Sequence, residues 1–104
     1  MTLRVKIFTI QNESPERFFR KMERTLRKGD LGKFATVELS LPLVKIRFDK
    51  LGITEFDYEI QADENNFKAS QTREKVALTH TFFRAEVEQE LTRIIQGFGG
   101  IVEP

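Results

Sequence analysis

The chain opens with a strict alternation of apolar and charged residues. Odd positions from Leu3 to Ile7 are apolar, whereas the even positions Arg4 and Lys6 carry cations. A period of two is typical of a strand with one buried face, so we expect a strand over about Leu3 to Ile10.

The spacing then changes to that of an amphipathic helix between Ser14 and Gly29. The Ser14 hydroxyl can cap the helix, Pro15 suits the first helical position, and Gly29 favours a left-handed stop. Apolar residues recur three and four positions apart, which predicts that they share one buried side of the helix. These residues are Phe18, Phe19, Met22 and Leu26.

The alternation of the next segment is irregular. Apolar residues occupy odd positions from Val37 to Leu43 and even positions from Val44 to Phe48, so the pattern slips by one beside Pro42. One interpretation is a single strand with a β-bulge or sharp bend at this proline, on an edge or otherwise unpaired position, because proline has no amide hydrogen for a ladder. The other is two separate short strands.

The residues that follow predict a hairpin with a defined register. If the numbers of paired residues sum to 102, apolar residues face each other on one side and opposite charges on the other, which favours this register over its neighbours. The loop would be Lys50 to Gly52, with Gly52 at a positive φ. The expected pairs are Ile46 with Phe56, Val44 with Tyr58, Arg47 with Glu55, and Lys45 with Asp57.

The remaining elements follow from the same two periods. We expect a turn at 63–66, a short strand at 67–70, a loop or bulge at 71–74, a central or penultimate strand at 76–82, a helix from Arg84 to Gly97 or Gly99, and a short edge strand at 101–102. The fold class is therefore α+β: a mostly antiparallel sheet of four to five strands with two amphipathic helices on one face. Its order is β-α-β-β-β-α, with a short terminal strand as an option.

Length and composition fit one soluble domain over residues 1–104. The ten Phe residues supply most of the bulky core material. The chain has no Cys, no apolar run of membrane-spanning length and no signal-peptide pattern, so we expect a cytoplasmic protein with no membrane association.

The first helix carries the clearest candidate for function. The net charge is only +1, yet residues 15–33 contain seven basic and three acidic residues. Six cations share the side of the helix opposite its apolar residues, which predicts a non-catalytic interaction module for an anionic partner, either an acidic protein or nucleic acid. The alternative is a solvated face without a partner. The six residues of this basic face are Arg17, Arg20, Lys21, Arg24, Arg27 and Lys28.

Weaker candidates define the competing functions. His80 and Tyr58 could line a small-ligand or catalytic pocket between helices and sheet, although a structural role is the more common one for a lone histidine. The carboxylates at 55, 57 and 59 and at 86, 88 and 90 fit ion pairs and a helix N-terminus better than a metal site. We expect no catalytic residue, metal or cofactor. Bent or terminal strands could also pair between copies and form a homo-oligomer.

Overall fold

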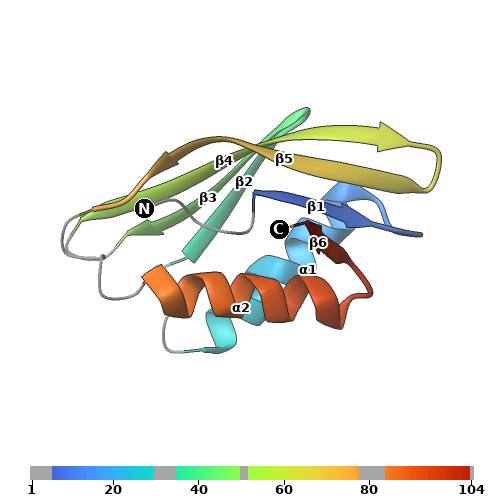
Figure 1. The fold of residues 1–104 in the computed structure, drawn as a ribbon. Helices are drawn as coiled ribbons and strands as arrows, with labels where there is room; N and C mark the ends of the chain where they lie inside the picture. The colour runs from blue at the N-terminus through green and yellow to red at the C-terminus, as the bar shows by residue number, and fades with distance from the viewer. Residues whose placement is uncertain (1–5, 30–34, 50–51, 78–83, 104) are drawn as a thin grey trace.

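The computed structural model describes residues 6–29, 35–49, 52–77 and 84–103. The elements are β1 (Ile7–Ile10), α1 (Pro15–Lys28), β2 (Ala35–Ser40), β3 (Leu43–Asp49), β4 (Ile53–Asp63), β5 (Asn66–Lys75), α2 (Arg84–Gly97) and β6 (Ile101–Glu103). The six strands form one sheet in the order β2-β3-β4-β5-β1-β6, and every neighbouring pair is antiparallel (Figure 1).

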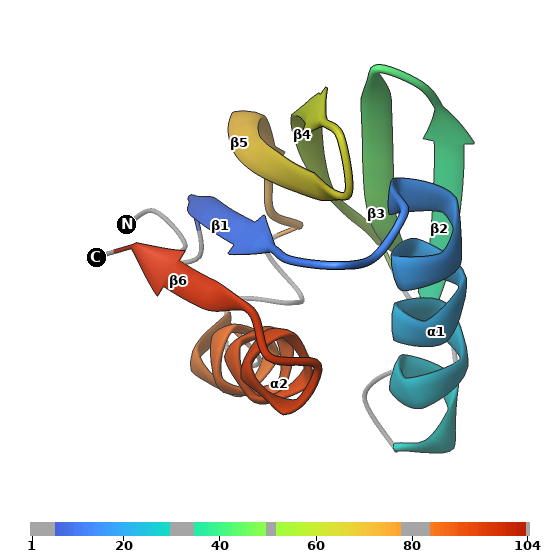
Figure 2. The same ribbon diagram turned by 90° about the vertical axis from the view of Figure 1, so that its right-hand side faces the viewer.

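The curved sheet arches over both helices, and the core lies between the inner face of the sheet and the helices (Figure 2). Alternate residues of the strands point to this inner side, where α1 lies beside β2 and α2 lies beside β6. The Phe18 ring packs edge-on against Phe19, with centroids 5.1 Å apart, and Phe8 and Phe67 surround this pair. Two helices and an antiparallel sheet confirm the α+β class.

The sheet has more strands than the four to five expected, because Pro42 separates two strands. The element order is therefore β-α-β-β-β-β-α-β, and the expected order β-α-β-β-β-α with an optional terminal strand is wrong. Residues Leu41 and Pro42, joined by a cis peptide bond, form the turn between β2 and β3. Val37 then lies opposite Ile46, so the odd and even apolar series reach the same face from two strands. The single bulged strand was the wrong interpretation, and the alternative of two short strands is confirmed.

The register of the β3–β4 hairpin is the expected one. Ile46 lies opposite Phe56 and Val44 opposite Tyr58, and Gly52 has a φ of 144°. The loop residues 50 and 51 lie outside the described part of the chain. Burial of both apolar pairs on the inner face explains why this register is favoured.

Other boundaries differ from the sequence expectations. β5 continues through 71–74 with a register shift opposite Asp57 and Tyr58, which confirms the bulge rather than the loop. β5 ends at Lys75, so the strand expected over 76–82 is wrong at residues 76 and 77, and its remainder lies outside the described residues. Residues 3–5 of the first expected strand also lie outside them.

The two helices end in different ways. Gly29 follows α1 with extended backbone, at a φ of −93°, so the expected left-handed stop is wrong there. After α2, Gly99 has a φ of 81°, and the amides of Gly99 and Gly100 donate to Gln96 and Ile95 carbonyls. This turn directs the chain into β6, which pairs with β1 at the edge of the sheet as expected.

Candidate functional site

The first turn of α1 is fixed by the residues that the sequence singled out. Ser14 Oγ accepts a hydrogen bond from the Arg17 amide at 3.3 Å, and Pro15 is the first helical residue. All four apolar residues of the helix are buried against the core: Phe18, Phe19, Met22 and Leu26. The basic face therefore points away from the core, as its spacing predicts.

One border of the basic face seals the free edge of β2. Glu23 Oε2 accepts a hydrogen bond from the Val37 amide at 2.8 Å, and Arg27 Nε donates to the Ala35 carbonyl at 3.1 Å. These backbone groups would otherwise be open to another strand. Arg20 Nη1 lies 3.6 Å from Glu23 Oε1 and completes this border. Arg27 thus holds α1 beside the sheet, whereas Arg20 is 57% exposed and contacts Glu23 of the same helix.

The opposite border of the basic face is fixed by Lys21. Its ammonium group lies 2.6 Å from Glu13 Oε2 and 5.7 Å from the centre of the Phe98 ring, and its side chain is only 34% exposed. The hydrogen bond from Lys21 holds the pKa of the Glu13 carboxyl below its usual range. Lys21 therefore connects the start of α1 to the residue that follows α2.

Three cations remain along the middle of the face: Arg17, Arg24 and Lys28, which we call the basic stripe. At 100° per residue they fall within an arc of about 40°, and they span about 16 Å of the helix. Arg17 is 75% exposed and lies 3.6 Å from Glu13, whereas Arg24 and Lys28 are exposed and make no ion pair or side-chain hydrogen bond within the described residues. Within the described residues, the basic stripe therefore makes fewer contacts with the rest of the fold than Lys21 and Arg27 do.

Of the two candidate pocket residues, the structure describes only Tyr58, and its side chain does not line an open site. Tyr58 is fully buried, and burial together with the negative charge of Glu74 raises the pKa of its hydroxyl. His80 lies outside the described residues. Since the Tyr58 side chain has no exposed surface, a ligand could reach it only after a rearrangement of the core.

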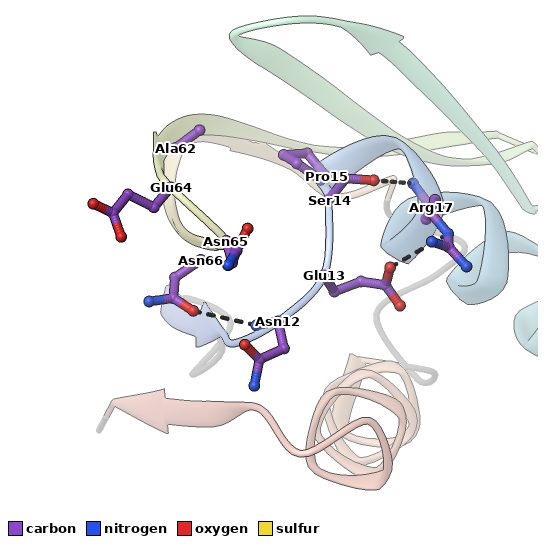
Figure 3. A pocket seen from close by; sticks show the side chains of 9 residues that line it. All are labelled: Asn12, Glu13, Ser14, Pro15, Arg17, Ala62, Glu64, Asn65 and Asn66. Carbon is purple, nitrogen blue, oxygen red and sulfur yellow. Dashed lines mark hydrogen bonds and ion pairs between the residues drawn. The ribbon is translucent and has the colours of Figure 1, made fainter.

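A surface hollow of about 400 Å³ lies between the start of α1 and the β4–β5 turn (Figure 3). The Glu13 amide donates to the Asn65 carbonyl at 3.0 Å, and the Asn12 amide donates to Asn66 Oδ1 at 3.2 Å. These bonds hold the two loops together. The hydrophobic pattern of the chain gives no indication of this hollow, and the pair of Asn-containing turns is its only signal in the sequence. Its lining is Asn12, Glu13, Ser14, Pro15, Arg17, Ala62, Glu64, Asn65 and Asn66.

The strand carboxylates form ion pairs, but not between the residues directly opposite. Lys45 Nζ reaches the diagonal neighbour Glu55 at 3.6 Å, and Arg47 contacts Asp49 on its own strand at 3.3 Å. Lys45 does lie opposite Asp57 and Arg47 opposite Glu55, so the expected cross-strand pairs are confirmed, although the ion-pair contacts are made to other carboxylates. Among the described residues, no group of three or more His, Asp or Glu side chains is arranged to hold a metal ion.

Comparison with known proteins identifies no relative of this chain. None of the helices within the described ranges is long and apolar enough to cross a membrane. No protein-family model, curated protein or solved structure matches this chain.

Proposed function

We propose that this protein is a non-catalytic binding module that docks on an acidic protein surface through the basic stripe. The observation that carries the proposal is the division of the basic face. Lys21 and Arg27 hold the helix in place, whereas Arg24 and Lys28 are exposed without a partner in the described structure. Cations that do not stabilise the fold are free to contribute to association.

The charges beside the stripe favour a protein partner over nucleic acid. Three cations can neutralise only about three phosphates, and this count gives weak, strongly salt-dependent binding, at a slope of about −0.9 per phosphate in log K against log salt. Glu13 lies 3.6 Å from Arg17, so a continuous phosphate backbone that follows the stripe past Arg17 would meet a carboxylate. A protein surface can place separate carboxylates opposite each cation and avoid this repulsion.

The test compares two double variants that change the net charge by the same amount. R24E/K28E reverses two of the three cations of the stripe, whereas K68E/R73E reverses two exposed cations on β5, at the other side of the sheet. The probes are a fluorescent poly-glutamate peptide and a fluorescent DNA duplex, measured by anisotropy over a salt series. We expect R24E/K28E to weaken peptide binding by about tenfold or more and K68E/R73E to leave it nearly unchanged.

Two results would overturn this proposal. Equal losses in both variants would mean that only the net charge matters. Tighter binding of the duplex than of the peptide at physiological salt would assign the stripe to nucleic acid instead.

A further inference from the structure

The tip of the β2–β3 hairpin exposes three consecutive apolar residues, which we call the apolar tip. Leu41 is 45% exposed and Leu43 is 51% exposed, and Pro42 between them is also exposed. Turns are usually built from polar residues, and a run of exposed apolar side chains marks a surface that contacts something else.

The apolar tip is held in place by the sheet. Ser40 pairs with Leu43 at the end of the hairpin, and the Pro42 carbonyl accepts a hydrogen bond from the Ile60 amide at 2.7 Å. A partner would therefore meet a preformed surface and would not have to order a loop.

Along the axis of α1, the apolar tip lies beyond the end of the basic stripe that begins at Arg17. Within the tip, Leu43 lies on the outer face of the sheet, because the neighbouring Val44 is buried on the inner face. The two contacts of α1 with the β2 edge show that β2 runs antiparallel to the helix, so its last residues approach the start of α1. Leu41 lies about 13 Å along the strand from Val37, and Arg17 lies about 9 Å back along the helix from Glu23. Both views place the hairpin turn beyond the N-terminal end of α1 (Figures 1 and 2).

We infer that the apolar tip and the basic stripe together bind one acidic protein segment that also carries apolar side chains at one end. This inference rests on the proposed function and adds the chemistry of the partner. Carboxylates of the segment would lie along Arg17, Arg24 and Lys28, and its apolar residues would cover Leu41 and Leu43. The surface is long and narrow, so it fits a short extended or helical segment and a transient complex better than a large interface.

The surroundings of the tip disfavour two other occupants. Glu59 lies directly opposite Leu43, and Glu38 on β2 is exposed, so an anionic group at the tip would be repelled. The proposed segment meets the tip with its apolar end and keeps its carboxylates at the stripe, whereas a membrane of anionic lipids would place headgroups around the tip. A second copy that used the same surface would place one basic stripe against another, which is repulsive.

The experiment selects ligands from a display library of random peptides of about 16 residues, with the whole chain as the target. We expect the enriched peptides to combine several Asp or Glu with two or more large apolar residues. Selected peptides are then measured by anisotropy against wild type, L41S/L43S and R24E/K28E. L41S/L43S should weaken binding roughly five- to tenfold without changing its salt dependence, and R24E/K28E should weaken binding and reduce its salt dependence. Thermal melts check that the variants remain folded.

Each alternative outcome contradicts either this inference alone or the proposed function as well. Acidic peptides that bind L41S/L43S as well as wild type would overturn this inference and leave the proposed function standing. Peptides insensitive to R24E/K28E, or no enrichment at all, would overturn both. The last experiment is sedimentation with vesicles that contain phosphatidylserine. If the chain binds these vesicles and L41S/L43S abolishes the binding, the tip would be assigned to a membrane surface and the inference would be overturned.

Discussion

Gly100 is the position at which the fold leaves least room for a side chain. A Cβ atom there would lie 2.5 Å from Ile10 Cδ1, 2.7 Å from Ile95 Cγ2 and 2.8 Å from the Ile95 carbonyl oxygen. Two of these atoms belong to the residue that accepts the Gly100 amide hydrogen bond, so the backbone cannot move away without breaking that bond. Replacement by Ala must therefore displace β6 or α2.

The size of the expected destabilisation follows from the cost of overpacking a core. Gly100→Ala should lower the free energy of unfolding by about 1–3 kcal/mol, which corresponds to a fall in Tm of roughly 4–20 °C for a domain of this size. Circular dichroism during thermal and urea unfolding measures both quantities. Gly97→Ala is the matched control, because nothing lies within 4 Å of a Cβ atom there. That control should be neutral or slightly stabilising.

A double-mutant cycle tests whether the Ile10 contact is the cause. Ile10→Val removes the Cδ1 atom and should cost about 0.5–1.5 kcal/mol in the wild-type background. In the Gly100→Ala background the same change should cost less or should stabilise, because it relieves the shortest contact. The contact with the Ile95 carbonyl would remain, so the rescue should be partial. Wild-type stability in Gly100→Ala, or strict additivity in the cycle, would refute the reasoning.

Three further predictions address α1 and its neighbours. Ser14→Ala removes the helix cap and should destabilise the protein by about 0.5–2 kcal/mol in urea unfolding, and an unchanged midpoint would contradict the cap. Glu23→Ala leaves the Val37 amide without its acceptor, so hydrogen exchange at this amide should accelerate, and unchanged protection would show that the carboxylate does not seal the edge. The pKa of Glu13 is lowered in the folded state by Lys21, so its stabilisation is present at neutral pH and is lost as the pH falls through the acid range. The difference in Tm between wild type and Glu13→Gln should therefore shrink toward pH 3, and a constant difference would rule out this linkage.

The elements that the sequence predicted well are those in which a local pattern has one physical outcome. The 3.6-residue period of α1 allows one buried side, and Phe18 and Met22 lie on it. The β3–β4 register was predictable because a shift of one residue would have placed Ile46 opposite a carboxylate. The number of strands was not predictable, since a slip in alternation at Pro42 fits either one bent strand or two strands. Only the pairing of Val37 with Ile46 decides between them.

The division of the basic face could not be predicted in the same way, because it depends on which elements lie beside α1. Periodicity places six cations on one side of the helix but does not say that β2 borders one flank and Phe98 the other. Arg27 and Lys21 differ from Arg24 by only part of a helical turn, yet this rotation brings them within reach of a strand edge and a ring. A charged helix face is therefore not a single functional unit. Its borders contact the rest of the fold, so if the proposed docking is correct, charge reversal confined to Arg24 and Lys28 should weaken association while leaving stability nearly unchanged.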